Sequence, residues 1–334
     1  MDDVKKLVTD INNKNLAPIY LLMGEEAYYI DKISDYIEAN VLAEEEKGFN
    51  QMVLYGRDVT IEDIVGNAKR FPMMADKQVV IVKEAQDLWR TIEKLVDYAK
   101  NPQPSTVLVL CYKYKTVDKR KALYKAINKA GVVFESKKFY DNQVPDWIRR
   151  TLSTKGYKIT PKASLMLVEF LGTDLSKINN ELEKLQIVLP QGTEISPSHV
   201  EENIGISKDY NNFELRKAIG SRDDIKAFKI VNYFGDNPKD NPMVVTVSLL
   251  FSFFSQLLQL HGMTDKSPRN ITSALRVNPY FVSEYLDAAR NFPMRKVSGI
   301  IATIREFDLK SKGVNANAVP QKDLLKELVV RILN

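Results

Sequence analysis

The sequence predicts a mixed fold, α/β plus all-α, in which a parallel α/β domain precedes domains built only of helices. Up to about residue 140, short apolar runs alternate with helical segments, a pattern typical of a parallel sheet covered on both faces. Beyond Phe139 the helical segments continue without a further convincing strand. We therefore expect an α/β domain at residues 1–140, a small helical bundle at 141–207 and a larger helical domain at 208–334, a division that suits a chain of 334 residues.

Five short apolar runs in the first domain predict strands. The run at 78–82 is largely β-branched, which indicates a strand buried on both faces of the sheet. The other expected strands lie at residues 19–23, 51–55, 106–111 and 132–134, and helices are expected at 28–41, 61–70, 91–100 and 120–129.

The remaining sequence carries helix signals. Residues 174–189 place large aliphatic side chains on one helical face, and Pro145 and Gly172 occupy positions that favour a helix start and a helix end. Residues 242–262 are apolar over most of the helical circumference, so we expect this helix at the centre of its bundle. The expected helices of these two domains are 145–154, 161–171, 174–189, 197–204, 213–220, 223–234, 242–262, 271–275, 279–291, 294–312 and 322–333.

The helix expected at 61–70 has signals at both ends. Thr60 and Asp63 form a capping-box signature, which predicts that the helix begins directly after Thr60. Pro72 disfavours helical geometry at the residue before it, so the helix should end there.

The segment that follows this helix is unusually apolar for a loop. Connections between a helix and a strand are normally polar and face the solvent. The side chains of this loop either pack under the sheet as core or form an exposed hydrophobic wedge for a partner, a use that suits the adaptable methionine side chain. The residues concerned are Phe71, Pro72, Met73 and Met74.

The sequence lacks the signatures of nucleotide binding and catalysis. The first expected strand is followed by Gly24, Glu25 and Glu26, and these carboxylates would repel phosphate at a helix start. No glycine is followed by lysine and no two glycines lie two apart, so neither a phosphate loop nor a dinucleotide fingerprint is present. His199 and His261 fall in different predicted bundles, which argues against a shared metal site or a histidine-based triad. We expect no catalytic residues, no metal and no cofactor.

The composition indicates a globular protein of a reducing compartment. Cys111 is the only cysteine, so no internal disulfide can form, and its place at the end of an apolar strand favours a core role over a nucleophile. The N-terminal segment lacks the apolar core of a signal peptide. The longest apolar stretch, 243–260, is interrupted by polar residues, so we expect no membrane-spanning segment and a cytoplasmic location.

A basic patch follows the fourth expected strand and is interleaved with tyrosines. The net charge of +5 permits contact with nucleic acid without arguing for it. Phosphate contacts are one interpretation of the patch, and an ordinary solvated surface is the other. The candidate DNA-contacting residues are Lys113, Lys115, Lys119, Arg120 and Lys121.

Five motifs occur in the order found in one protein family. On these motifs and on the domain sizes, the chain resembles the bacterial DNA polymerase III delta subunit family over essentially its whole length. The motifs are Ile19-Tyr-Leu-Leu-Met-Gly-Glu25 with Tyr28-Tyr29-Ile30, Phe71-Pro-Met-Met-Ala-Asp-Lys-Gln-Val-Val-Ile-Val82, Leu175-Ser-Lys-Ile-Asn-Asn-Glu-Leu-Glu-Lys-Leu185, Val277-Asn-Pro-Tyr-Phe281 and Asp308-Leu-Lys-Ser-Lys-Gly313.

The resemblance implies a role in DNA replication as a non-catalytic clamp-loader subunit of the DNA-directed DNA polymerase (nucleotidyltransferase) holoenzyme. The first domain would be AAA+-like without a phosphate loop, the small bundle would be a lid, and the C-terminal domain would join the helical collar of the loader. The implied partners are the sliding clamp (the beta ring), the other loader subunits of the delta-prime and gamma/tau types, and primer-template DNA within the complex.

The resemblance also implies a clamp-binding site. Carried over by position, Phe71, Pro72, Met73 and Met74 would insert into a pocket on the clamp and open the ring or hold it open. Pro72 stiffens the loop, which lowers the ordering cost of binding. The family pattern near the C-terminus, which includes Asp308, Lys310 and Lys312, gives no physical role beyond a polar face.

Two other functions are compatible with the same sequence. An active AAA+ ATPase of DNA replication or repair, such as a motor-type loader subunit or a Holliday-junction helicase, would show ATP turnover. A nucleic-acid-binding adaptor that uses the basic patch would bind DNA in a salt-sensitive way, independently of the apolar loop.

Overall fold

The computed structural model describes residues 2–314 and 319–334 and divides into two compact units, Met1–Phe139 and Tyr140–Asn334. The division expected from the sequence into 1–140, 141–207 and 208–334 stays a prediction.

The first unit contains a five-stranded sheet with helices between its strands. All neighbouring strands run parallel, in the order β2-β3-β4-β1-β5. The strands are β1 (Ile19–Gly24), β2 (Gln51–Tyr55), β3 (Gln78–Lys83), β4 (Thr106–Lys113) and β5 (Val132–Ser136). The helices are α1 (Asp2–Asn12), α2 (Ala27–Asn40), α3 (Glu44–Asn50), α4 (Ile61–Ala68), α5 (Val96–Lys100) and α6 (Ala122–Ala130), with short 3₁₀ helices η1 (Ala85–Leu88) and η2 (Ile92–Leu95).

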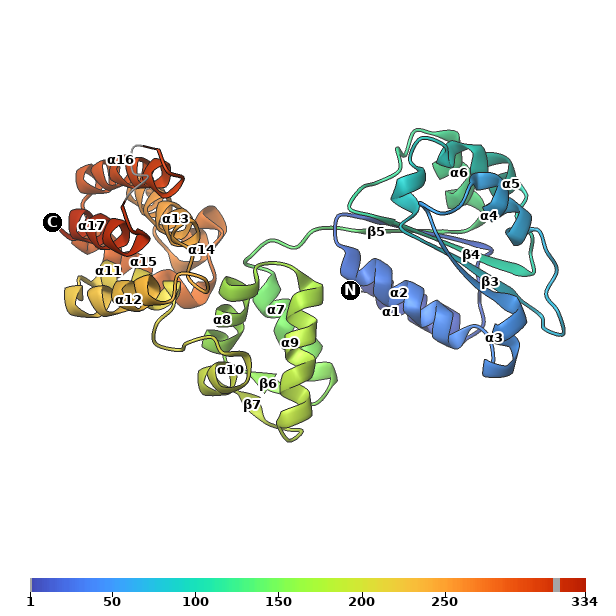
Figure 1. The fold of residues 1–334 in the computed structure, drawn as a ribbon, viewed down its shortest axis with the longest axis horizontal. Coiled ribbons are helices and arrows are strands. Elements are labelled where there is room, and N and C mark those ends of the chain that lie inside the picture. Colours follow the sequence, from blue (N-terminus) through green and yellow to red (C-terminus); the bar gives the residue numbers. More distant parts are fainter. Residues whose placement is uncertain (1, 315–318) are drawn as a thin grey trace. The chain divides into compact units, whose positions relative to one another are not determined.

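The central strands are buried on both faces because successive side chains alternate between two hydrophobic cores. In β3, Val79 and Ile81 pack with α1 and α2, whereas Val80 and Val82 pack with α4, α5 and α6. Figure 1 shows these two sets of helices on opposite faces of the sheet. The prediction of a parallel sheet covered on both faces is therefore confirmed.

Several local predictions for this unit need correction. Helices α1 and α3 were not predicted from the sequence, and the helix expected at 61–70 ends at Ala68. The fourth strand continues beyond Cys111 to Lys113, which places the first lysine of the basic patch inside the sheet. The capping box is present as predicted, since Thr60 N–H donates to Asp63 Oδ2 at 2.9 Å and Asp63 N–H donates to Thr60 Oγ1 at 3.2 Å.

The second unit is almost entirely helical. Its helices are α7 (Val144–Thr154), α8 (Pro161–Leu171), α9 (Leu175–Val188), α10 (Pro197–Ile204), α11 (Asn212–Ser221), α12 (Asp224–Asp236), α13 (Met243–Gly262), α14 (Pro268–Leu275), α15 (Val282–Asn291), α16 (Met294–Ser311) and α17 (Gln321–Leu333), with a 3₁₀ turn η3 (Pro279–Phe281). The expectation of no strand here was wrong, because β6 (Lys158–Ile159) and β7 (Glu194–Ile195) pair in parallel. Strands of two residues carry no alternating pattern that a sequence could reveal.

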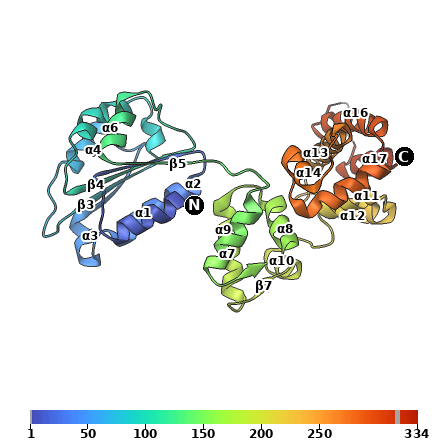
Figure 2. The ribbon, with the colours of Figure 1, turned by 180° about the vertical axis from the view of Figure 1, so that it is seen from behind.

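Helix α13 supplies much of the core among the last helices. Its buried face includes Leu250, Phe254 and Leu257, and the helix packs against α16, as Figure 2 shows from behind. By length and composition alone α13 could also span a membrane, but the burial of this face within the helical core accounts for its apolar character. We expected this helix at the centre of its bundle, but one side of it is exposed, at Val244, Val245, Leu249 and Phe251.

Lys310, in the last of the sequence motifs, lies at the contact between α16 and α17. Lys310 lies 2.7 Å from Glu306 in its own helix and 3.9 Å from Glu327 in α17, with its ammonium over the Phe307 ring. Lys312 pairs with Asp308 at 2.7 Å.

Candidate functional site

The loop between α4 and β3, residues 69–77, is anchored at its base by the side chain of Gln78. The Nε2 atom of this buried amide lies 3.2 and 3.4 Å from the carbonyl oxygens of Asn67 and Ala68, and 2.7 Å from Thr106 Oγ1. The Thr106 hydroxyl in turn donates to the Ala68 carbonyl at 2.8 Å. These contacts provide partners for carbonyl groups at the end of α4, which ends at Ala68.

The tip of the loop is held by Asn50, the last residue of α3. The side-chain oxygen of Asn50 accepts a hydrogen bond from the Met73 N–H at 2.7 Å, and its Nδ2 donates to the Met73 carbonyl at 2.9 Å. One amide therefore pairs with both backbone groups of Met73, as the backbone of a neighbouring strand would. Asn50 is only 5 % exposed, so water competes little for these bonds.

The large apolar side chains of the loop face the solvent. Phe71, Met73 and Met74 are 78, 58 and 103 % exposed, whereas Pro72 is partly buried. They are not core beneath the sheet, and a contact with a partner stays a prediction. A fourth large apolar side chain, Phe49, is 78 % exposed and directly precedes Asn50.

Met74 has a backbone conformation that a non-glycine residue seldom adopts. Its φ of 53° lies in the left-handed region, which costs a residue with a side chain about 1–2 kcal/mol. Such a conformation persists only where the surrounding structure fixes it. Asn50 fixes Met73, the residue directly before Met74, and Gln78 fixes the end of α4 at the base of the loop.

The carboxyl edge of the sheet is occupied by ion pairs of the chain itself. Parallel α/β sheets bind their ligands at this edge. Here the Lys113 ammonium lies 2.8 Å from Asp31 in α2 and 2.9 Å from Glu84 after β3, and the Lys83 ammonium lies 2.7 Å from Asp35. Burial lowers the pKa of Lys113, but the hydrogen bonds with Asp31 and Glu84 outweigh it and hold this pKa above its usual value.

Backbone geometry restricts the same edge. Gly24, at the end of β1, has a φ of 130°, and a Cβ atom built there would lie 2.1 Å from the Ser136 carbonyl oxygen. Only glycine fits this close approach between β1 and the end of β5. Cys111 is buried in β4, and burial raises the pKa of its thiol to about 11, so it stays protonated and is a poor nucleophile.

The basic patch is not one uniform surface. Lys113 is buried and paired, as described above, and therefore does not present a free ammonium to DNA. Lys119, Arg120 and Lys121 are exposed, with Lys119 2.6 Å from Glu135 and Arg120 2.8 Å from Asp118; Lys115 is exposed as well.

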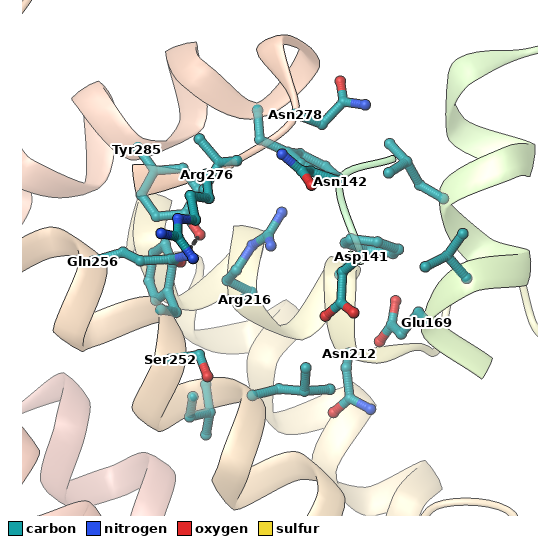
Figure 3. Close-up of a pocket in the computed structure, with 18 of the residues that line it drawn as sticks. Asp141, Asn142, Glu169, Asn212, Arg216, Ser252, Gln256, Arg276, Asn278 and Tyr285 are labelled. Carbon is teal, nitrogen blue, oxygen red and sulfur yellow. Dashed lines mark hydrogen bonds between the residues drawn. The ribbon is translucent and has the colours of Figure 1, made fainter. Parts of the chain in front are cut away.

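A cavity of about 430 Å³ lies in the second unit and was not anticipated from the sequence. Figure 3 shows Arg216 near its centre, Asp141 and Glu169 on one side, and Arg276 and Gln256 on the other. The Arg216 guanidinium lies 4.2 Å from the centre of the Phe281 ring and 3.3 Å from Glu284. Burial raises the pKa of Glu169 to about 7, against the opposing effects of the Arg216 charge and of the N–H groups near the start of α11.

The two histidines have separate local roles. His199 accepts the Ser196 N–H through Nδ1 at the start of α10, at 3.2 Å. His261, near the end of α13, lies 2.8 Å from the Phe292 carbonyl oxygen.

Comparisons with known proteins identify first the fold and then the family. The Bacillus subtilis DNA clamp loader delta protein has the same fold: the structures align over 99 % of each chain with a TM-score of 0.56 and 24 % sequence identity. The fold class expected from the sequence is therefore confirmed.

The sequence comparisons cover both units of the chain. The profile of the family described as DNA polymerase III, delta subunit, matches residues 20–137, and the profile described as DNA polymerase III delta subunit, C-terminal domain, matches residues 209–329. The DNA polymerase III subunit delta of Bacillus subtilis (strain 168) is 28 % identical over 323 residues, which span 93 % of this chain and 91 % of that protein. The chain belongs to the DNA polymerase III delta subunit family, and the resemblance found in the sequence is confirmed.

Proposed function

We propose that this chain is the clamp-loader subunit that binds the sliding clamp through Phe71, Pro72, Met73 and Met74 and opens the ring, or holds it open, for loading on primed DNA. Family membership supports a place in the DNA polymerase III clamp loader. The observation that carries the proposal is the exposure of three large apolar side chains on a loop that Gln78 holds at its base and Asn50 holds at its tip.

The loop has the physical properties of an interface anchor. A few large apolar side chains that enter a pocket supply most of the affinity of a typical interface. The fixed backbone reduces the conformational entropy lost on binding. If the loop binds the open ring better than the closed ring, it shifts the clamp toward the open state without any hydrolysis by this chain.

The chain acts in this proposal without catalysis of its own, as a member of the polymerase holoenzyme. Phosphate would have to displace the pairs of Lys113 with Asp31 and Glu84 to occupy the carboxyl edge of the sheet. The chain also contains no Gly-Lys sequence, as a phosphate loop would require, which supports a role without nucleotide hydrolysis. We propose the cytoplasm as the place of action, because chromosome replication takes place there in bacteria.

The exposed stripe of α13 is our candidate surface for the other loader subunits, of the delta-prime and gamma/tau types. Apolar side chains gathered on one exposed helical face are typical of protein contacts. The stripe is formed by Val244, Val245, Leu249 and Phe251, each between 40 and 46 % exposed.

We also propose that the exposed part of the basic patch, namely Lys115, Lys119, Arg120 and Lys121, contacts primer-template DNA within the complex. The carboxylates beside Lys119 and Arg120 do not preclude this, because exposed ion pairs contribute little free energy and exchange partners readily. Removal of one phosphate-binding side chain by mutation should reduce the slope of log K against log salt concentration by about 0.9. Lys113 is left out of this set because it is buried.

The proposal is tested by the affinity of the purified full chain for its own sliding clamp. The variant Phe71→Ala/Met73→Ala/Met74→Ala loses three anchors, and we expect its affinity to fall at least about a hundredfold, or ~2.7 kcal/mol. A matched control removes three exposed apolar side chains elsewhere, Phe170→Ala/Ile187→Ala/Val188→Ala. The control should bind as the natural chain does. Equal binding by the loop variant and the natural chain would overturn the assignment of clamp binding to this loop.

A further inference from the structure

We propose that Asn50 is a positioning residue for clamp binding, because it holds Met73 and Met74 in the conformation that the clamp accepts. Asn50 lies 23 residues before Met73 and on a different element, α3. The inference rests on the proposed function of the loop and adds to it a residue that does not itself need to touch the clamp.

The chemistry of the side chain fits this role. The Met73 backbone presents one donor and one acceptor. The Asn50 amide forms a hydrogen bond with each of them, at 2.7 and 2.9 Å. Aspartate would place an acceptor against the Met73 carbonyl oxygen, which is also an acceptor. An apolar side chain would form a hydrogen bond with neither backbone group. Asn50 is only 5 % exposed, so a backbone group left there without a hydrogen bond would cost free energy. The loop would then move to expose that group to water.

Asn50 is itself held in place by its helix. Its Nδ2 lies 3.0 Å from the Glu46 carbonyl, and the Glu46 side chain accepts the Ala43 N–H at the start of α3 at 3.1 Å. The short helix is therefore a fixed support for the tip of the loop. The strained residue, Met74, follows directly after the one that Asn50 holds.

The consequence is a separation of roles between the loop and α3. Phe71, Met73 and Met74 would supply contact area, and Asn50 would reduce the number of conformations that the loop samples before it binds. Loss of Asn50 should weaken clamp binding even though all three apolar side chains are still present.

The first arm of the test reports on the loop without the clamp. Limited trypsin digestion of the full chain measures cleavage after Arg70, which lies within the loop. We expect faster cleavage there in Asn50→Ala and in Asn50→Asp. A matched control is Asn211→Ala, which removes another buried amide that caps a helix through the Glu214 N–H at 3.0 Å and bonds the Ser207 carbonyl at 2.9 Å. Cleavage after Arg70 should not change in this control.

The second arm measures clamp affinity in a double-mutant cycle. Asn50→Ala should weaken binding about tenfold in the natural chain but less than about threefold in a Met74→Ala background, because its effect passes through the loop. Equal effects in both backgrounds, or unchanged cleavage after Arg70 in both Asn50 variants, would overturn the inference. If Asn50→Ala is too unstable to purify, Asn50→Asp is carried through the same cycle and read in the same way.

The two proposals fail in different ways. If the Phe71/Met73/Met74 variant binds the clamp normally, the loop is not the binding site and the proposed function falls. If that variant loses binding while both Asn50 variants bind normally, only the positioning role of Asn50 is wrong.

Discussion

The ammonium of Lys113 lies 2.9 Å from the carboxylate of Glu84, at the edge of the sheet where α/β proteins hold their ligands. The same ammonium reaches Asp31 in α2 at 2.8 Å, so one lysine ties the ends of β3 and β4 to the helix that follows β1. The hydrogen bonds of Lys113 and Gln86 lower the pKa of Glu84, although burial acts in the opposite direction. The edge is thereby occupied by ion pairs of the chain itself, in which the carboxylates outnumber the ammonium groups.

Replacement of Lys113 should therefore destabilise the first unit. In Lys113→Met the carboxylates of Asp31 and Glu84 lose their common partner. We expect the free energy of unfolding to fall by about 2 kcal/mol. This is less than the loss for a fully buried pair, because both carboxylates are about one-third exposed. Urea unfolding measures this loss. The neighbouring variant Lys115→Met, at an exposed position, should leave stability unchanged, and equal stability of the two variants would contradict this account.

The pH dependence of stability should reveal the buried carboxyl of Glu169. Its pKa is about 7 in the folded protein and about 4.5 ordinarily, so the folded state binds this proton more tightly than the unfolded state does. The free energy of unfolding should therefore fall as the pH rises from about 4.5 to about 7 and lose about 3 kcal/mol over that window. Below the window the carboxyl is protonated in both states, and above it the carboxyl is ionised in both.

The variant Glu169→Gln isolates this contribution. It removes the titrating group with little change in shape, so it should be more stable than the natural chain above pH ~7 and lose this advantage as the pH falls toward ~4.5. Denaturant unfolding at the two ends of the window measures the difference between the two proteins, in which other titrating groups cancel. A difference that does not change with pH would show that Glu169 is not held protonated by its surroundings.

Replacement of Met74 by glycine should affect clamp binding but not the stability of the chain. Glycine adopts the φ of 53° without strain, so Met74→Gly should not lower the thermal stability of the chain. The same change removes a fully exposed apolar anchor, and we expect clamp affinity to fall about tenfold. Thermal unfolding and clamp titration of one preparation give both quantities. A large loss of stability with normal clamp binding would refute this interpretation of the residue.

Charges on the exposed face of α13 should impair assembly with the other loader subunits. Leu249→Lys/Phe251→Glu places two charges in the apolar stripe without touching the buried face of the helix. We expect the variant to fail to co-elute with the remaining subunits in size-exclusion chromatography, yet to bind the clamp as before. Ile225→Lys, at a 74 % exposed apolar position of α12 outside the stripe, is the control and should still assemble.

Much of the fold could be predicted from the sequence because its signals are local. The β-branched run of β3, the capping box of α4 and the prolines at helix starts depend on residues close together in the chain. Helix α1 was missed although Val4, Leu7 and Ile11 follow helical spacing, so its amphipathic pattern could have revealed it. The very short β6 and β7 carry no comparable signal.

The site was predicted less completely because its support comes from distant residues. Phe71, Met73 and Met74 stand out as apolar residues in a loop, but nothing near Asn50 in the sequence indicates its bonds to Met73. Lys113 was grouped with the DNA-contacting candidates because the fourth strand was expected to end at Cys111. Because the strand continues for two more residues, Lys113 belongs to the sheet and its side chain is buried, where it pairs with Asp31 and Glu84.

The most direct test of the central claim is site-specific photo-crosslinking to the sliding clamp. A photoreactive side chain is placed at position 74, and a matched one at position 187, where Ile187 is 83 % exposed on α9. We predict efficient crosslinking to the clamp from position 74 alone. Equal crosslinking from the two positions, or crosslinking from position 187 only, would contradict the assignment of clamp binding to the loop at 69–77.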